Sequence, residues 1–152
     1  MTVSPAVAVD LDAIGDTRAL WEAWVDSAQA VLEIDPATLS PDRAEAAATL
    51  DSSGAGNWRV LLERFAEDHA AAYLRRDAAA SSVLRTFASN GTRLGVFTDA
   101  PAELARVALA QLGATRRVTA VESGEGALAR LLARLGSNTE VVRTRSDLLA
   151  RH

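Results

Sequence analysis

The 152-residue sequence contains no cysteine and no lysine, so all sixteen of its basic residues are arginines. Without cysteine the chain cannot form disulfides, thiolate metal sites or cysteine nucleophiles. Without lysine it cannot form a Schiff base or hold a phosphate group with a lysine ammonium. Several classes of enzyme are therefore excluded before any motif is considered.

Long apolar runs and an excess of positive charge are also missing. No stretch is long and uncharged enough to cross a bilayer, and no basic flank precedes an apolar run near the N-terminus. The formal net charge of −4 disfavours nucleic acids and anionic membranes as partners. We expect a single-domain cytoplasmic protein with neither a nucleic-acid nor a membrane partner.

Strand-like and helix-like patterns alternate along the second half of the chain. Short apolar runs that end in polar residues cover residues 6–11, 93–99, 116–123 and 139–144, and apolar residues at helical spacing lie between the later ones. Strands and helices in this order predict an α/β fold with a Rossmann-like parallel sheet of about four strands flanked by helices.

The first connection between strands is unusually long. Roughly 75 residues of helix-rich chain lie between the strand that contains Val7 and the strand that contains Leu94, whereas a crossover needs about a dozen. Helices are predicted to begin after Asp16 or Thr17, after Ser40 and after Asn57. We therefore predict an α/β core of residues 1–16 and 90–152, with residues 17–89 inserted as a helical cap. Such a cap would lie over the edge of the sheet where open α/β folds bind ligands.

Two tryptophans, Trp21 and Trp24, lie on the apolar stripe of the first predicted cap helix. We expect them in the core of the cap or at an interface with another chain. Stacking against a substrate is the alternative.

Polar side chains follow two of the predicted strands. VAVDLDAIGDT, residues 7–17, places Asp10 and Asp12 at the end of the first strand, and GVFTDAP, residues 95–101, places Thr98 and Asp99 at the end of the second. The two segments resemble the first and second motifs of the haloacid dehalogenase superfamily. The inserted helices fall where the phosphoglycolate-phosphatase-like branch of that family has its cap.

The resemblance implies a chemistry for each of these residues. Asp10 would attack phosphorus and become an aspartyl-phosphate, while Asp12 would protonate the leaving oxygen and later activate water. Thr98 would bind the phosphoryl oxygens, with Asp99 as a further candidate for substrate binding. Magnesium would join the Asp10 carboxylate to the backbone carbonyl of Asp12. From the residues alone, the aspartates could instead end a strand or cap a helix, and Asp99 could serve as an N-cap or turn residue.

The remaining family motifs are altered. Ala13 and Ile14 replace the glycine and threonine that follow the second aspartate in the family, and the lysine of the third motif is missing. Arg116, Arg117 or Arg130 could supply the missing positive charge, although none stands at an obvious equivalent position.

In the fourth motif, Arg143 and Thr144 replace glycine and aspartate, which leaves Asp147 as the nearby acid for a metal site with Asp10 and Asp12. Arg143 and Arg145 would flank that site. Two like charges about 4 Å apart repel by about 4 kcal/mol at an effective dielectric of 20. We expect weak magnesium binding, and Arg143 could instead hold a phosphate directly as a substrate-binding residue.

These observations predict a haloacid-dehalogenase-like hydrolase whose phosphatase-type site, acting on a small phosphomonoester, is impaired or lost. If active, the site uses magnesium; if inactive, it needs no cofactor. The alternative is a non-catalytic protein, a pseudoenzyme, that binds an anion without metal or acts through a protein partner. The protein partner could be a second copy of the chain, bound through Trp21 and Trp24 in a homodimer.

Overall fold

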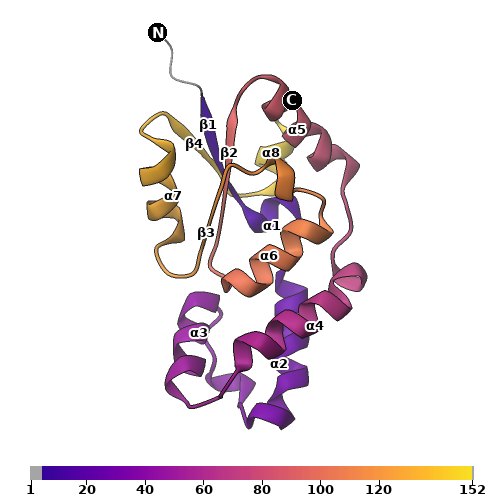
Figure 1. The fold of residues 1–152 in the computed structure, drawn as a ribbon, viewed down its shortest axis with the longest axis vertical. Coiled ribbons are helices and arrows are strands. Elements are labelled where there is room, and N and C mark those ends of the chain that lie inside the picture. The colour runs from indigo at the N-terminus through magenta and orange to yellow at the C-terminus, as the bar shows by residue number, and fades with distance from the viewer. Residues whose placement is uncertain (1–4, 152) are drawn as a thin grey trace.

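Four parallel strands form the centre of the molecule, which we describe over residues 5–151 from a computed structural model (Figure 1). The strands are β1 (Ala6–Asp10), β2 (Arg93–Thr98), β3 (Ala120–Ser123) and β4 (Thr139–Val142). Their order in the sheet is β3-β2-β1-β4, and every neighbouring pair is parallel. The predicted four-stranded parallel sheet with flanking helices is confirmed. Residues 1–4 and 152, at the ends of the predicted core, lie outside the described residues.

Helices cover both faces of this sheet and form the long insertion after β1. They are α1 (Leu11–Ile14), α2 (Arg18–Leu32), α3 (Arg43–Ser52), α4 (Trp58–Tyr73), α5 (Ala78–Ser89), α6 (Ala102–Gln111), α7 (Ala127–Leu135) and α8 (Arg145–Leu149), with short 3₁₀ turns η1 (Pro36–Thr38) and η2 (Thr115–Arg117). Over the described residues, no helix is long and apolar enough to span a membrane.

Alternation along β1 divides the core between the two faces. Ala6 and Ala8 point toward α7, where they pack with Leu131 and Leu135. Val7 and Val9 point to the other face and belong to a larger cluster that includes buried residues of α5, α6 and α8. Ala6 and Ala8 are small, so α7 packs close to the sheet on their face. The apolar layer on the opposite face is larger.

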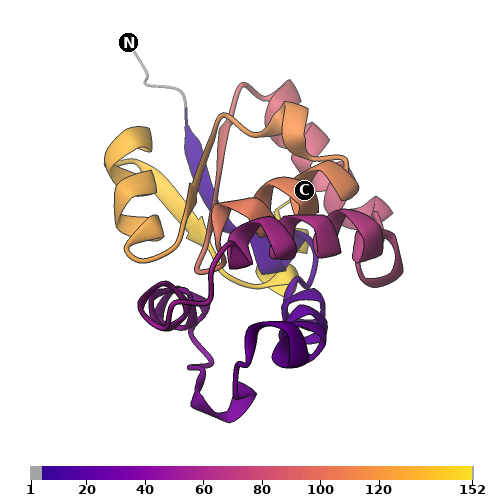
Figure 2. The ribbon, with the colours of Figure 1, turned by 60° about the horizontal axis from the view of Figure 1, so that its bottom comes forward.

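The insertion leaves the sheet at the end of β1 and returns through α5 to β2 (Figure 1). Its helices α2 and α3 lie apart beneath the sheet, joined through η1, as Figure 2 shows from below. Helix α4 packs against α6 of the core, and α5 packs against β2 and α8. The expected cap boundary at residue 89 stays a prediction, and the contacts of α5 favour a boundary near Asp77.

Local capping explains where helix α3 of the insertion begins. The Asp42 carboxylate accepts hydrogen bonds from the backbone N–H groups of Ala44 and Glu45, so α3 begins at Arg43 rather than directly after Ser40 as predicted. Ser40 instead accepts a hydrogen bond from the Asp42 N–H. The shift matters because it places Arg43 in the first turn of α3.

The tryptophans fill the interior of the insertion. Trp21 and Trp24 are buried in α2, with their ring centroids 5.3 Å apart, and Trp24 contacts Trp58 of α4 at 5.8 Å. The expectation that they lie in the core of the cap is confirmed. Their rings are covered by protein, so they offer no surface for stacking a substrate.

Candidate active site at the carboxyl edge of the sheet

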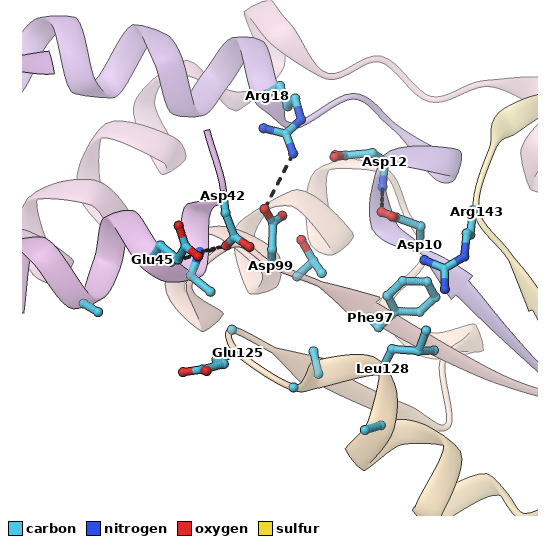
Figure 3. A pocket seen from close by; sticks show the side chains of 17 residues that line it. Asp10, Asp12, Arg18, Asp42, Glu45, Phe97, Asp99, Glu125, Leu128 and Arg143 are labelled. Carbon is cyan, nitrogen blue, oxygen red and sulfur yellow. Dashed lines mark hydrogen bonds and ion pairs between the residues drawn. The ribbon is translucent and has the colours of Figure 1, made fainter. Parts of the chain in front are cut away.

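A cavity of about 520 Å³ lies between the carboxyl ends of β1 and β2 and helix α3 (Figure 3). The parallel register pairs Val9 with Val96 and Asp10 with Phe97, so the two strands deliver their following residues to one edge. Ala44, Glu45 and Ala48 of α3 form the wall on the side of the insertion, and the loop that leads into α7 forms another. The cavity thus lies between the sheet edge and the inserted helices, as the sequence indicated.

Five residues selected from the sequence line this cavity together. They are Asp10, Asp12, Thr98, Asp99 and Arg143. Figure 3 shows Arg143, Asp10 and Phe97 gathered at one end, whereas Asp42, Glu45 and Glu125 lie at the other. The cavity therefore has a mixed end, with one arginine and one aspartate, and a purely acidic end.

Asp147, the third predicted metal ligand, is not brought to the cavity. It is exposed in α8, where its backbone N–H donates to the Thr144 hydroxyl that caps the helix. Arg145, expected beside the cation site, instead forms an ion pair with Asp77. The turn that begins α8 directs both side chains away, so the predicted set of Asp10, Asp12 and Asp147 does not form.

Asp10 is half-buried at the end of β1 and also caps the short helix α1. Its Oδ1 accepts the backbone N–H of Asp12 at 2.9 Å. Burial raises the pKa of Asp10, and the neighbouring charges of Asp12 and Asp99 act in the same direction, against the hydrogen bond from the Asp12 N–H and the charge of Arg43. A nucleophilic carboxylate must be ionised, so this environment makes Asp10 a less available nucleophile at acidic pH.

Both carboxylate oxygens of Asp12 are occupied by donors. Oδ1 accepts the Thr17 hydroxyl at 2.6 Å and the Thr17 backbone N–H at 3.0 Å. Oδ2 accepts Nη2 of Arg43 at 2.9 Å. A general acid needs an oxygen directed at the leaving group within hydrogen-bond reach. In this arrangement each oxygen of Asp12 already has a partner within the protein, which competes with a leaving group for the carboxyl group.

Arg43 is the main residue of the site that sequence reasoning missed. It comes from α3, yet its side chain is only 1% exposed. Its Nε contacts Oδ1 of Asp99 at 2.9 Å, and its Nη1 donates to the Thr17 hydroxyl at 2.6 Å. An arginine in the first turn of an alanine-rich helix gives no sequence signal of burial, since such a residue is usually solvated.

Thr98 and Asp99 have partners within the protein. The buried Thr98 hydroxyl oxygen accepts the Ala100 N–H at 3.1 Å. The N-cap position of α6 is held by Pro101, so the reading of Asp99 as an N-cap residue is wrong. Burial favours the neutral form of Asp99, but hydrogen bonds and charge from Arg43 outweigh it, and the pKa of Asp99 is lowered. Asp99 is thus an anchor for α3.

The donor groups at this edge do not fit a magnesium ion. Asp12 is held by Arg43 and Thr17, Arg143 lines the cavity, and Asp147 lies elsewhere. Over residues 5–151 no group of three or more histidine, cysteine, aspartate or glutamate side chains is arranged to hold a metal. Magnesium prefers near-octahedral oxygen ligands, and Asp10 is the one predicted ligand here that has no arginine partner.

The arginines considered as replacements for the family lysine lie outside the cavity lining. Arg130 is bound to Glu122 and to the backbone carbonyls of Ser123 and Glu125, and Arg117 donates to the Gly113 carbonyl. Arg18 does line the cavity, but it contacts Asp99 at 3.5 Å and the Pro41 carbonyl. Of the described arginines that line the cavity, Arg143 is the one with no carboxylate partner.

The chain is similar to solved structures over most of its length. The chain resembles CbbY from Rhodobacter sphaeroides in complex with phosphate, with a TM-score of 0.69 at 13% identity over 91% of this chain and 77% of that one. The fold is haloacid-dehalogenase-like. A candidate beta-phosphoglucomutase from Thermotoga maritima matches with a TM-score of 0.58 at 16% identity, over 91% of this chain and 74% of that chain. No protein-family model and no curated protein sequence matches the chain.

Proposed function

We propose that this haloacid-dehalogenase-like chain binds a small phosphorylated molecule at the carboxyl edge of its sheet and has lost metal-dependent phosphatase turnover. One observation carries the proposal: both oxygens of Asp12 are held by Thr17 and Arg43. The residue that the fold would use as general acid therefore already accepts hydrogen bonds from the protein at both of its oxygens, although it lines the cavity. Among residues 5–151 no group of three acids is arranged around Asp10 to hold a metal, which supports the same proposal.

Binding is supported separately from catalysis. Arg143 is exposed at the cavity, and its guanidinium lies over the Phe97 ring at 6.0 Å without a carboxylate partner. A guanidinium in this state can donate two parallel hydrogen bonds to the oxygens of a phosphate. The anion is expected at the Arg143 end, since Asp42, Glu45 and Glu125 would repel it at the other. Asp10 would meet the phosphate at the same end and repel it unless protonated.

The proposal is tested by measuring turnover and binding on the same preparation. With an aryl phosphate and 5 mM MgCl₂, we expect wild-type phosphate release to equal that of Asp10→Asn. Catalysed release that depends on magnesium and disappears in Asp10→Asn would contradict the loss of turnover, because it would show a working nucleophile and cation.

Binding is measured by thermal shift in metal-free buffer. Inorganic phosphate is expected to raise the Tm of the wild type, and the rise should disappear in Arg143→Ala. Arg116→Ala is the matched control, since this exposed arginine lies outside the cavity lining and should leave the response unchanged. An equal response in all three proteins would refute binding at the Arg143 end.

A further inference from the structure

Arg43 is the only charged side chain among the described residues that is buried. It originates from the insertion, whereas its partners Asp12 and Asp99 follow the core strands β1 and β2. Burying an arginine costs free energy unless the charge is paired and its N–H groups are satisfied. The contacts of Arg43 therefore have to pair its charge and satisfy its N–H groups.

Those contacts form a closed network. Nη2 lies 2.9 Å from Oδ2 of Asp12 and 2.8 Å from Oδ1 of Asp99, so a single nitrogen bridges the two carboxylates. The backbone N–H of Arg43 donates to the other oxygen of Asp99 at 3.0 Å. The Thr17 hydroxyl accepts a hydrogen bond from Nη1 of Arg43 and donates one to Oδ1 of Asp12. Two negative charges of the core thus converge on one positive charge of the insertion.

We infer that Arg43 is the resident counter-cation of Asp12 and Asp99, carried in by the insertion. Its guanidinium compensates Asp12 and Asp99 where a cation would otherwise be required, and it simultaneously fixes α3 against the sheet edge. Arg43 is a positioning residue, since it acts by holding Asp12 and does not line the cavity. For these two carboxylates the positive charge is already supplied by the protein.

Removal of this charge would create a demand for a cation. In Arg43→Gln, Asp12 and Asp99 would face a space vacated by the guanidinium that now bridges them. Carboxylate oxygens are ligands that a hard divalent cation prefers. A purely structural arginine, by contrast, would leave behind a damaged protein that is indifferent to magnesium.

The experiment compares melting temperatures in metal-free buffer and in 10 mM MgCl₂ at matched ionic strength. The wild type is expected to show no shift, and Arg43→Gln a rise in Tm of about 3 °C or more for a Kd near 1 mM. Arg43→Lys retains the charge and should remain insensitive. The double variant Arg43→Gln/Asp99→Asn lacks one carboxylate and should lose most of the gain.

Each outcome is decisive. A folded Arg43→Gln without a magnesium response, or one whose response Arg43→Lys reproduces, would overturn the inference. If Arg43→Gln is unfolded in metal-free buffer, circular dichroism should show that it refolds in 10 mM MgCl₂; failure in both buffers would also overturn it. The inference rests on the proposed function only in that neither assigns the wild type a metal. Magnesium-dependent turnover by the wild type would refute that function, whereas the response of Arg43→Gln tests Arg43 alone.

Discussion

Replacement of Arg43 by glutamine should lower the free energy of unfolding by about 3 kcal/mol in metal-free buffer. Breaking a buried ion pair by removing one partner typically costs about 3–5 kcal/mol, because the other charge is left uncompensated. The lower end of that range applies because the side chains of Asp12 and Asp99 are 25% and 30% exposed, so water can solvate them partly. Urea unfolding followed by circular dichroism measures the difference.

Arg106→Gln is the matched control for this effect. Arg106 forms an ion pair with Glu63, but its side chain is 61% exposed, and exposed pairs are worth about 0–1 kcal/mol. We expect a change below about 0.5 kcal/mol for this variant. If Arg43→Gln cost no more than Arg106→Gln, the network around Arg43 would not be holding the insertion to the core.

Trp24→Ala should be at least as destabilising, by about 3–5 kcal/mol. Trp24 is 2% exposed and packs between Trp21 and Trp58, so its removal opens a cavity that neighbouring helices cannot readily close. The insertion and the larger face of the sheet share one apolar cluster, so we expect a single cooperative transition at lower urea concentration.

Val31→Ala on the same helix provides the comparison, because Val31 is 72% exposed and should change the stability by less than about 0.5 kcal/mol. Two separated transitions for Trp24→Ala would show that the insertion unfolds independently of the core. That result would conflict with one continuous core, and it would weaken the idea that α3 and the sheet edge form one site.

The sheet edge could be predicted from sequence because its geometry follows from local patterns. Apolar runs that end in Asp10 and Thr98 identify two buried strands, and parallel neighbours bring their carboxyl ends to one edge. The clustering of Asp10, Asp12, Thr98 and Asp99 needed only that rule and the recognised motifs. The inserted helices could be predicted because the interval between these two strands is much longer than a crossover needs.

The parts that sequence reasoning missed depend on how distant segments dock. Arg43 reaches Asp99 across 56 positions of sequence, and its burial follows from where α3 comes to rest on the core. Asp147 lies outside the cavity lining because β4 ends at Val142 and Thr144 caps the start of α8, which leaves Asp147 exposed. No local sequence pattern predicts the docking of α3 on the core or the position of Asp147.

The functional reading of the motifs changes once Arg43 is included. The sequence alone presents Asp12 as a free acid/base residue with a missing metal partner. The structure presents the same side chain as the centre of a contact between the core and the insertion. A carboxylate that holds the protein together is poorly suited to donate and accept protons with each turnover.

A double-mutant cycle between Asp12 and Arg43 tests this contact most directly. Unfolding free energies are measured for the wild type, Asp12→Asn, Arg43→Gln and the double variant in metal-free buffer. A direct contact in a shared network predicts a coupling energy of about 1.5–3 kcal/mol. Effects that add to within about 0.5 kcal/mol would contradict the account, because Asp12 would then be free of Arg43 and available for catalysis.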